Sequence, residues 1–408
     1  MTALNALADA PWLTEQRIRR VALIFAGLTL VTLAGSAWFH TRAGVTSAAG
    51  EYLGADFINY WAGAHLAAHG HAAAAYDIDG FMAWQRAHSA SNAQVKWYSY
   101  PPTALLLSLP LALFGFKTGL VAWLVAGWGV CFLLLKRILS WPAAMLASFA
   151  APASFINALS GQNGQFSAAL LCGGVLLLDS NPLMAGLLFG LLCFKPHLAI
   201  LVPVALAAGG YWRAFAASAI TALAVTAASL LLFGDGAWLA FLHNAPLNTW
   251  LMEQNTGLWH RMPTVFAMTR FLGGPVIAAY GLQIVSAIAA IILVIRCWRS
   301  AVSTGTKGAV LVLATFVATP YAWDYDLVSL TFAIAWLAAD GLKNGFRPWE
   351  KSLLAFAGAI PLILSPLGAA THLQIGPLVL WPMLLLAAGV FCKKRSAPEP
   401  APMLHRPA

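Results

Sequence analysis

The side chains that could do chemistry in this chain are few, and the first is Asp56 in the stretch GADFINYWAGAHLAAHG, residues 54–70. Only 9% of the 408 residues are charged, so an acid one turn before the aromatic pair Tyr60 and Trp61 stands out. A carboxylate can take the proton of a hydroxyl group and make its oxygen nucleophilic. Asp56 is therefore a candidate general base, and the alternatives are a helix N-cap or a solvated surface acid.

Lys195 and His197 form a second candidate site, because they interrupt the otherwise apolar stretch 182–209. Pro196 breaks the helical pattern between them. An ionisable side chain within a membrane is costly and is a functional candidate by default. Lys195 could meet a phosphate group as a compact positive charge. Alternatively, it could pair with an acid or extend its amine toward the membrane surface.

His260 and Arg261 lie in the stretch NTGLWHRMPTVF, residues 255–266, between two apolar segments. The planar guanidinium of an arginine presents several N–H donors that match the oxygens of a phosphate. Arg261 is therefore a candidate phosphate ligand, with His260 beside it. The alternative is that both side chains extend into solvent from a loop.

Asp324 and Asp326 lie among aromatic residues in ATPYAWDYDLVSL, residues 318–330. Two acids separated by one residue resemble some divalent-metal sites, since carboxylate oxygens suit hard cations. The same acids could instead bind sugar hydroxyls, pair with Lys195 or Arg261, or cap the helix that follows. Two acids alone are weak evidence for a metal, and we expect none.

Gln162, Asn163 and Gln165 lie at the mouth of an apolar segment, in the stretch NALSGQNGQFSAALL, residues 157–171. Amide groups at this depth need hydrogen-bond partners, because burying them without partners is costly. Gln162 and Asn163 are candidates for binding the hydroxyl groups of a sugar. The alternative is that these amides cap helices and form hydrogen bonds between them.

The composition shows what kind of protein must position these residues. Hydrophobic residues make up 60% of the chain, whereas a soluble domain is about half apolar and about a quarter charged. We therefore expect an all-α polytopic membrane protein. The net charge is +9, but the basic residues gather at the ends of apolar segments, as in cytoplasmic loops. No basic patch with interleaved aromatic residues is present, so we expect a bilayer and not a nucleic acid as partner.

The apolar segments predict about 11 to 13 transmembrane helices, because a helix needs about 20 apolar residues to cross a bilayer. The first segment, at 21–39, is expected to be an uncleaved anchor. Segment 101–116 is short and contains three prolines, so we expect a re-entrant or broken helix there. Counting sides backward from the basic residues 393–395 places nearly all of the polar motifs on the outer side.

The predicted domain organisation follows from these spans. We expect one integral membrane domain over residues 1–395 and a disordered cytoplasmic tail over 396–408. The first outer loop would occupy 40–99 and the second 234–273. A short amphipathic helix is expected after Asp56, lying on the membrane surface. Its apolar face would carry Phe57, Tyr60, Trp61, Ala64 and Leu66.

Taken in order, the motifs resemble the membrane glycosyltransferases of the GT-C superfamily, and most closely glycosyltransferase family 87 (DUF2029). This group includes mycobacterial polyprenol-phosphate-mannose-dependent mannosyltransferases. The matching text is ADFINYWAGAHLAAHGHAAAAYD (55–77), YSYPP (98–102), GQNGQ (161–165), AGLLFGLLCFKPHLAIL (185–201) and TPYAWDYDL (319–327). The chain departs from the family pattern at Gln165, where the family often has Asn.

The resemblance implies an enzyme that moves a sugar, expected to be mannose or another hexose, from a polyprenyl-phosphate donor to a lipid or glycan acceptor. Transfer would take place on the periplasmic or extracellular side of a bacterial inner membrane, without a cofactor or a metal. The acid of the family's first loop falls on Asp56, which would be the general base.

The other candidates would bind the donor. Lys195, helped by His197 and Arg261, would stabilise the charge that develops on the leaving phosphate. Tyr60 and Trp61 would pack against the prenyl chain or the faces of the sugar. The remaining donor-site candidates are His260, Gln162, Asn163, Asp324 and Asp326.

Two other functions would fit a chain of this composition. A transporter or flippase for a polyprenyl-linked lipid would need internal repeats with broken helices in corresponding positions, and the sequence shows no such repeats. A non-catalytic scaffold would leave the gathering of polar motifs on one side unexplained. We therefore expect an enzyme, with the transporter as the alternative.

Overall fold

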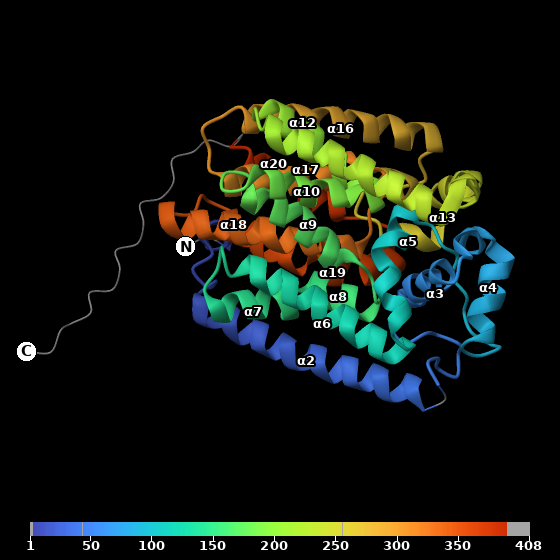
Figure 1. Cartoon of the computed structure of the whole chain (residues 1–408). Coiled ribbons are helices and arrows are strands. Elements are labelled where there is room, and N and C mark those ends of the chain that lie inside the picture. The colour runs from blue at the N-terminus through green and yellow to red at the C-terminus, as the bar shows by residue number, and fades with distance from the viewer. Residues whose placement is uncertain (1–2, 43, 255, 390–408) are drawn as a thin grey trace, which may run out of the picture.

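A computed structural model of the protein describes residues 3–42, 44–254 and 256–389 (Figure 1). Of the residues in these ranges, 77% are helical, and none lies in a β-strand. An isolated antiparallel bridge joins Thr46 to Tyr52. A helix satisfies its own backbone hydrogen bonds, which a lipid environment requires. The expected all-α class is confirmed.

Several helices are long and apolar enough to cross a membrane. Within the described ranges, six meet this condition by length and composition. They are α2 (Glu15–Thr41), α6 (Phe116–Leu135), α13 (Trp212–Gln254), α16 (Val276–Trp298), α18 (Val328–Asn344) with the preceding 3-10 turn η4 (Asp324–Leu327), and α19 (Glu350–Thr371). A seventh span is formed if α7 (Trp141–Ala150) and α8 (Pro152–Leu159), which are bent by 44° at their junction, are counted together. The chain is thus a multi-pass membrane protein.

Shorter apolar helices lie between the long ones. They are α5 (Pro102–Ser108) with η2 (Leu109–Leu113), α9 (Gly164–Leu177), α10 (Pro182–Leu191) with η3 (Leu192–Phe194), α11 (Pro196–Ala199) with α12 (Val202–Ala208), α17 (Thr304–Ala318), and α20 (Gly376–Ala387). At about 1.5 Å per residue, none of them spans the roughly 30 Å of a hydrocarbon core alone. α17 is nevertheless buried from Gly308 to Ala318. The expected number of about 11 to 13 crossings stays a prediction.

The remaining described elements are short. They are α1 (Ala3–Asp9), α3 (Phe57–Ala68), η1 (Ala72–Tyr76), α4 (Ile78–Ala87), α14 (Thr256–Trp259) and α15 (Val265–Phe271). Figure 1 places α3 and α4 at one end of the bundle, beside α5 and α13. α1 is fastened to the start of α19, where the Trp349 N–H donates to Ala8 O at 2.7 Å and the Ser352 hydroxyl donates to Leu7 O at 2.5 Å.

The helix expected after Asp56 is present as α3, but its expected orientation on a membrane surface is wrong. Phe57 and Tyr60 are buried. The centroid of the Phe57 ring lies 5.3 Å from that of Phe116 and 6.1 Å from that of Trp123. α3 packs on α5 and η2. Its apolar face therefore belongs to the protein core, which fixes the position of the residues at its start.

The interval predicted to be the second outer loop, 234–273, is largely helical. α13 continues past a kink at Gly234, which has φ 75° and ψ 172°. Two asparagines of α13 beyond the kink form hydrogen bonds with the interval 40–99. Asn244 Nδ2 donates to Tyr76 O at 2.6 Å, and Asn248 Oδ1 accepts from Trp97 Nε1 at 3.2 Å. The two intervals thus support each other.

The predicted cytoplasmic tail, 396–408, and the basic residues 393–395 lie outside the described residues. The single-domain organisation over 1–395 stays a prediction.

Candidate functional site

Segments that are far apart in the sequence meet where α3, α8, α9 and η4 begin or end. The backbone N–H of Asp56 donates to Ser160 O at 3.0 Å, and the backbone N–H of Asp324 donates to Arg261 O at 2.9 Å. η4 packs against α8, α9 and α19. These contacts bring most of the predicted site residues into one polar cluster.

Asp56 occupies the N-cap position of α3, but its side chain forms no capping hydrogen bond. Its Oδ2 accepts a hydrogen bond from Gln162 Nε2 at 2.9 Å, and its Oδ1 lies 3.5 Å from Lys96 Nζ. The side chain is 19% exposed. Ala55, just before it, has a φ of 36°, a conformation that costs a residue with a Cβ about 1–2 kcal/mol. The carboxylate is thus oriented by other segments and remains accessible.

Two tyrosines orient the amide of Gln162. Its Oε1 lies 2.5 Å from Tyr60 Oη and 3.1 Å from Tyr100 Oη, and the two hydroxyls are 2.7 Å apart. Burial raises the pKa of Tyr60 and of Tyr100 well above the ordinary value, so both hydroxyls remain protonated donors. Because the amide oxygen accepts from tyrosine, the amide nitrogen must face Asp56. Tyr60 therefore lies beneath the site and offers no open face to a sugar.

The turn that carries Gln162 depends on Gly161. Gly161 has a φ of +58°, and a Cβ at this position would lie 2.2 Å from Gly54 O and 2.7 Å from Phe57 Cβ. Glycine is thus needed both for the backbone conformation and for the close approach of the two turns. Through this approach, the 160–164 turn reaches the start of α3.

Of the alternatives for Lys195, the structure shows pairing with an acid. Lys195 Nζ lies 2.5 Å from Asp326 Oδ1 and 2.6 Å from Asn163 Oδ1, and the lysine side chain is only 2% exposed. Asp326 Oδ2 also accepts from the backbone N–H of Trp323 at 3.0 Å. His197 Nε2 lies 3.9 Å from Asp326 Oδ2, too far for a hydrogen bond. This pair is closed to solvent.

Arg261 pairs with Asp324 in a more open arrangement. Its Nε and Nη2 donate to both carboxylate oxygens at 2.9 Å, and Nη2 also donates to Ser160 Oγ at 3.3 Å. Burial lowers the pKa of Arg261, but hydrogen bonds to Asp324 and its charge outweigh this and raise the pKa above its ordinary value. The side chain is 28% exposed. Arg261 therefore presents a fixed positive charge that solvent can reach.

The candidates His260 and Trp61, and the neighbouring amide of Gln165, take no part in the side-chain hydrogen bonds described above. His260 packs beside Gly368 of α19, and its backbone oxygen accepts from Gln374 Nε2 at 3.1 Å. Trp61 donates from Nε1 to Phe114 O at 2.8 Å and contacts the His65 ring at 4.3 Å. Gln165 lies deeper, where its Oε1 accepts from Asn157 Nδ2 at 2.8 Å.

The two aspartates of the D-x-D stretch do not share a cation, because Asp324 pairs with Arg261 and Asp326 with Lys195. In the described ranges, no group of three or more His, Cys, Asp or Glu side chains is arranged to hold a metal ion. The absence of a metal from the reaction stays a prediction.

Sequence reasoning missed Lys96, Gln85 and Tyr100. Tyr100 lies within the YSYPP motif, and its hydroxyl joins Tyr60 and Gln162. Lys96 is the first lysine of the chain and comes two residues before that motif. A lone lysine in the same outer interval as the candidate base was the available signal. Gln85 gave none, because its role depends on a contact across 11 positions.

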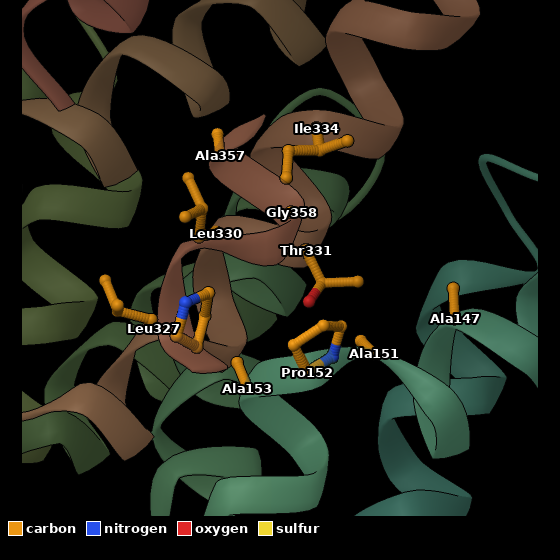
Figure 2. Close-up of a pocket in the computed structure, with 11 residues that line it drawn as sticks. Ala147, Ala151, Pro152, Ala153, Leu327, Leu330, Thr331, Ile334, Ala357 and Gly358 are labelled. Atoms are coloured by element: carbon orange, nitrogen blue, oxygen red, sulfur yellow. The ribbon is translucent and has the colours of Figure 1, made fainter. Parts of the chain in front are cut away.

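An apolar pocket of about 170 Å³ opens beside η4. Figure 2 shows residues near the α7–α8 bend facing residues of η4, α18 and α19. Its lining is Ala147, Ala151, Pro152, Ala153, Leu327, Leu330, Thr331, Ile334, Ala357, Gly358 and Pro361. Leu327 directly follows Asp326, so the pocket adjoins the polar cluster.

The model of glycosyltransferase family 87 matches residues 98–320, which is more than half of the 408-residue chain. No curated protein and no solved structure matches the chain. The matched interval contains Tyr100, Gln162, Lys195 and Arg261, whereas Asp56 precedes it. The resemblance inferred from the motifs is confirmed: this multi-pass membrane protein belongs to glycosyltransferase family 87.

Proposed function

We propose that this glycosyltransferase moves a hexose from a polyprenyl-phosphate donor to a hydroxyl group of a lipid or glycan acceptor, with Asp56 as the general base. The reaction would take place on the outer face of a bacterial inner membrane. The observation that carries the proposal is the accessible Asp56 carboxylate, oriented by Gln162 within a cluster that also presents Arg261.

Asp56 supplies the proton acceptor that the reaction needs. The acceptor oxygen attacks the anomeric carbon of the sugar while the bond from that carbon to the phosphate oxygen breaks. The acceptor proton passes to a carboxylate oxygen of Asp56, and polyprenyl phosphate leaves with the bonding electrons. Because a phosphate group is already ionised at neutral pH, the leaving group needs no general acid.

Arg261 is the better of the two paired cations for stabilising the phosphate. Lys195 is buried with Asp326 and Asn163, so its ammonium is already surrounded by acceptors. Arg261 is held rigidly by Asp324 yet remains partly exposed. A fixed positive charge at the position where negative charge develops lowers the barrier without reorganisation.

The pocket beside η4 suits the isoprenoid chain of the donor. Its lining is apolar apart from Thr331, and small residues such as Ala153 and Gly358 leave it open. Thr331 and Ile334 are half-buried, so the pocket reaches the surface of the protein, and we propose that this surface faces lipid. A chain bound here would extend from the membrane toward Asp326, with its phosphate near the polar cluster. A branched hydrocarbon is therefore the occupant that we propose.

The test is transfer by the purified protein in lipid nanodiscs, with a polyprenyl-phosphate hexose compared against a nucleotide sugar. We expect transfer from the lipid-linked donor only. Asp56→Asn should lower turnover by about 100- to 10,000-fold, with donor binding retained. Asp79→Asn, an exposed acid on α4 in the same interval, is the control and should be unaffected. Wild-type turnover by Asp56→Asn, or use of the nucleotide sugar, would overturn the proposal.

A further inference from the structure

Lys96 is the cation nearest to the proposed base. Its ammonium lies 3.5 Å from Asp56 Oδ1, and its side chain is 35% exposed. A charge-assisted hydrogen bond of this type is about 2.7–2.9 Å long, so the two groups face each other without a close bond. Lys96 is therefore a partly solvated cation at the mouth of the site.

The position of Lys96 is specified by a buried glutamine. Gln85 Nε2 donates to Lys96 O at 2.7 Å, and Gln85 Oε1 accepts from the backbone N–H of Lys96 at 3.0 Å. Gln85 Nε2 also lies 3.3 Å from Asn59 Oδ1, which ties this arrangement to α3. The nitrogen and the oxygen of the fully buried Gln85 amide thus both bond the backbone of Lys96. The backbone that carries the Lys96 ammonium is therefore fixed beside α3.

The charges of the cluster show what Lys96 contributes. Lys195 and Arg261 are each neutralised by one aspartate, Asp326 and Asp324. Without Lys96, the cluster would keep the uncompensated charge of Asp56 and would repel an anionic donor. With Lys96, the described cluster is neutral overall. An ammonium has three donors, and Lys96 makes no close bond to Asp56, so it can donate to the oxygens of an incoming anion instead.

We propose that Lys96 is a ligand of the donor phosphate, held in place by Gln85, and that it turns from Asp56 to the phosphate when the donor binds. This inference rests on the proposed function and adds a residue to its donor site. Binding of the phosphate would free Asp56 Oδ1 to meet the acceptor hydroxyl. As polyprenyl phosphate leaves, its charge increases and the ammonium stabilises it.

The test uses farnesyl phosphate, with farnesol as the uncharged comparison, on the full-length protein in nanodiscs. Affinity is measured by microscale thermophoresis, and the KM of the lipid-linked donor is measured in parallel. Lys96→Met should weaken farnesyl phosphate binding and raise the donor KM by about 10- to 100-fold. Lys96→Arg should retain most of both, because it keeps the charge. Farnesol should bind the wild type and Lys96→Met equally.

Lys117→Met is the matched control, since Lys117 is an exposed lysine at the start of α6, which packs against α3. It should bind farnesyl phosphate like the wild type. If Lys96→Met binds farnesyl phosphate normally but turns over slowly, Lys96 acts only through Asp56 and the inference is wrong while the proposed function stands. If the wild type does not bind farnesyl phosphate and transfers sugar from a nucleotide donor, the proposed polyprenyl-phosphate donor is wrong. The inference about Lys96 is then wrong as well.

Discussion

At the scale of single residues, the site is organised by pairs whose partners come from distant parts of the chain. Asp56 meets Gln162 and Lys96, while Lys195 meets Asp326. The side chains in these pairs differ in burial, and that difference separates their roles. The Lys195–Asp326 pair is closed to solvent, whereas the Asp56 side chain is 19% exposed, so we propose a structural role for the pair and a catalytic role for Asp56.

We predict that Lys195→Ala chiefly lowers stability. Removing the ammonium leaves the buried Asp326 carboxylate unpaired, which costs about 3–5 kcal/mol. The double variant Lys195→Met/Asp326→Asn should recover part of this loss, since it leaves no buried charge and keeps an oxygen for the Trp323 N–H. Thermal unfolding and donor affinity, measured on the same samples, distinguish the roles. A stable Lys195→Ala protein that no longer binds donor would show instead that Lys195 holds the phosphate.

The sequence identified Asp56, Lys195, Arg261 and the two later aspartates as candidates, because ionisable groups are conspicuous in an apolar chain. It left open whether Lys195 meets a phosphate or an acid, since spacing along the chain says nothing about a partner 131 positions away. In the folded geometry Lys195 pairs with Asp326. Lys96 escaped notice for the same reason, because its importance lies in a contact with Asp56.

At the scale of elements, the turns between helices determine how closely the side chains approach. The 160–164 turn contacts the 54–57 turn through Gly161, and η4 presents Asp324 and Asp326 to the two cations. The sequence predicted the helix after Asp56 from its apolar periodicity. It could not predict what covers that face, because the same pattern suits a membrane surface and a protein core.

We predict that Gly161→Ala impairs both stability and transfer. The new Cβ would collide with Gly54 O, and its left-handed backbone would cost about a further 1–2 kcal/mol. Moving the turn would separate Gln162 from Asp56. Gly210→Ala is a matched control, since Gly210 has a φ of +73° but nothing lies within 4 Å of its Cβ position. Equal losses in the two variants, measured by thermal unfolding and turnover, would show that the close approach is unimportant.

At the scale of the whole molecule, residues from the bend between α7 and α8 line an apolar pocket together with residues of η4, α18 and α19 (Figure 2). The composition predicted the membrane class. It could not predict the pocket, because the pocket arises from small side chains on separate helices that come together only in the fold.

We predict that Gly358→Leu discriminates against long donors. Leucine should favour helix α19 by about 0.8–1 kcal/mol, so stability should not fall. Its side chain would enter the pocket, where a Cβ has only Ile334 Cδ1 nearby at 3.8 Å. The KM of a long-chain donor should rise about tenfold. This is the effect expected if roughly two methylene groups of the isoprenoid chain are no longer buried in the pocket. A farnesyl donor should be less affected.

Gly281→Leu on α16 controls for added bulk, because its Cβ position has no neighbour within 4 Å. It should leave the KM of both donors unchanged. An unchanged preference for chain length in Gly358→Leu would exclude the pocket as the site of the isoprenoid chain.

The hydrogen bonds that fasten α1 to the start of α19 also constrain the order in which the protein can be made. α2 is synthesised early. The hydrogen bonds from α1, which precedes it, to α19 cannot form until Trp349 and Ser352 have left the ribosome. The pairing of Lys195 with Asp326 must wait for almost as much of the chain. During synthesis, α2 would therefore lie in the bilayer before α1 can bind α19. Ionisable side chains such as Lys195 would still lack their partners. Lys195 and Arg261 gain their aspartate partners only after residues 324–326 have been synthesised.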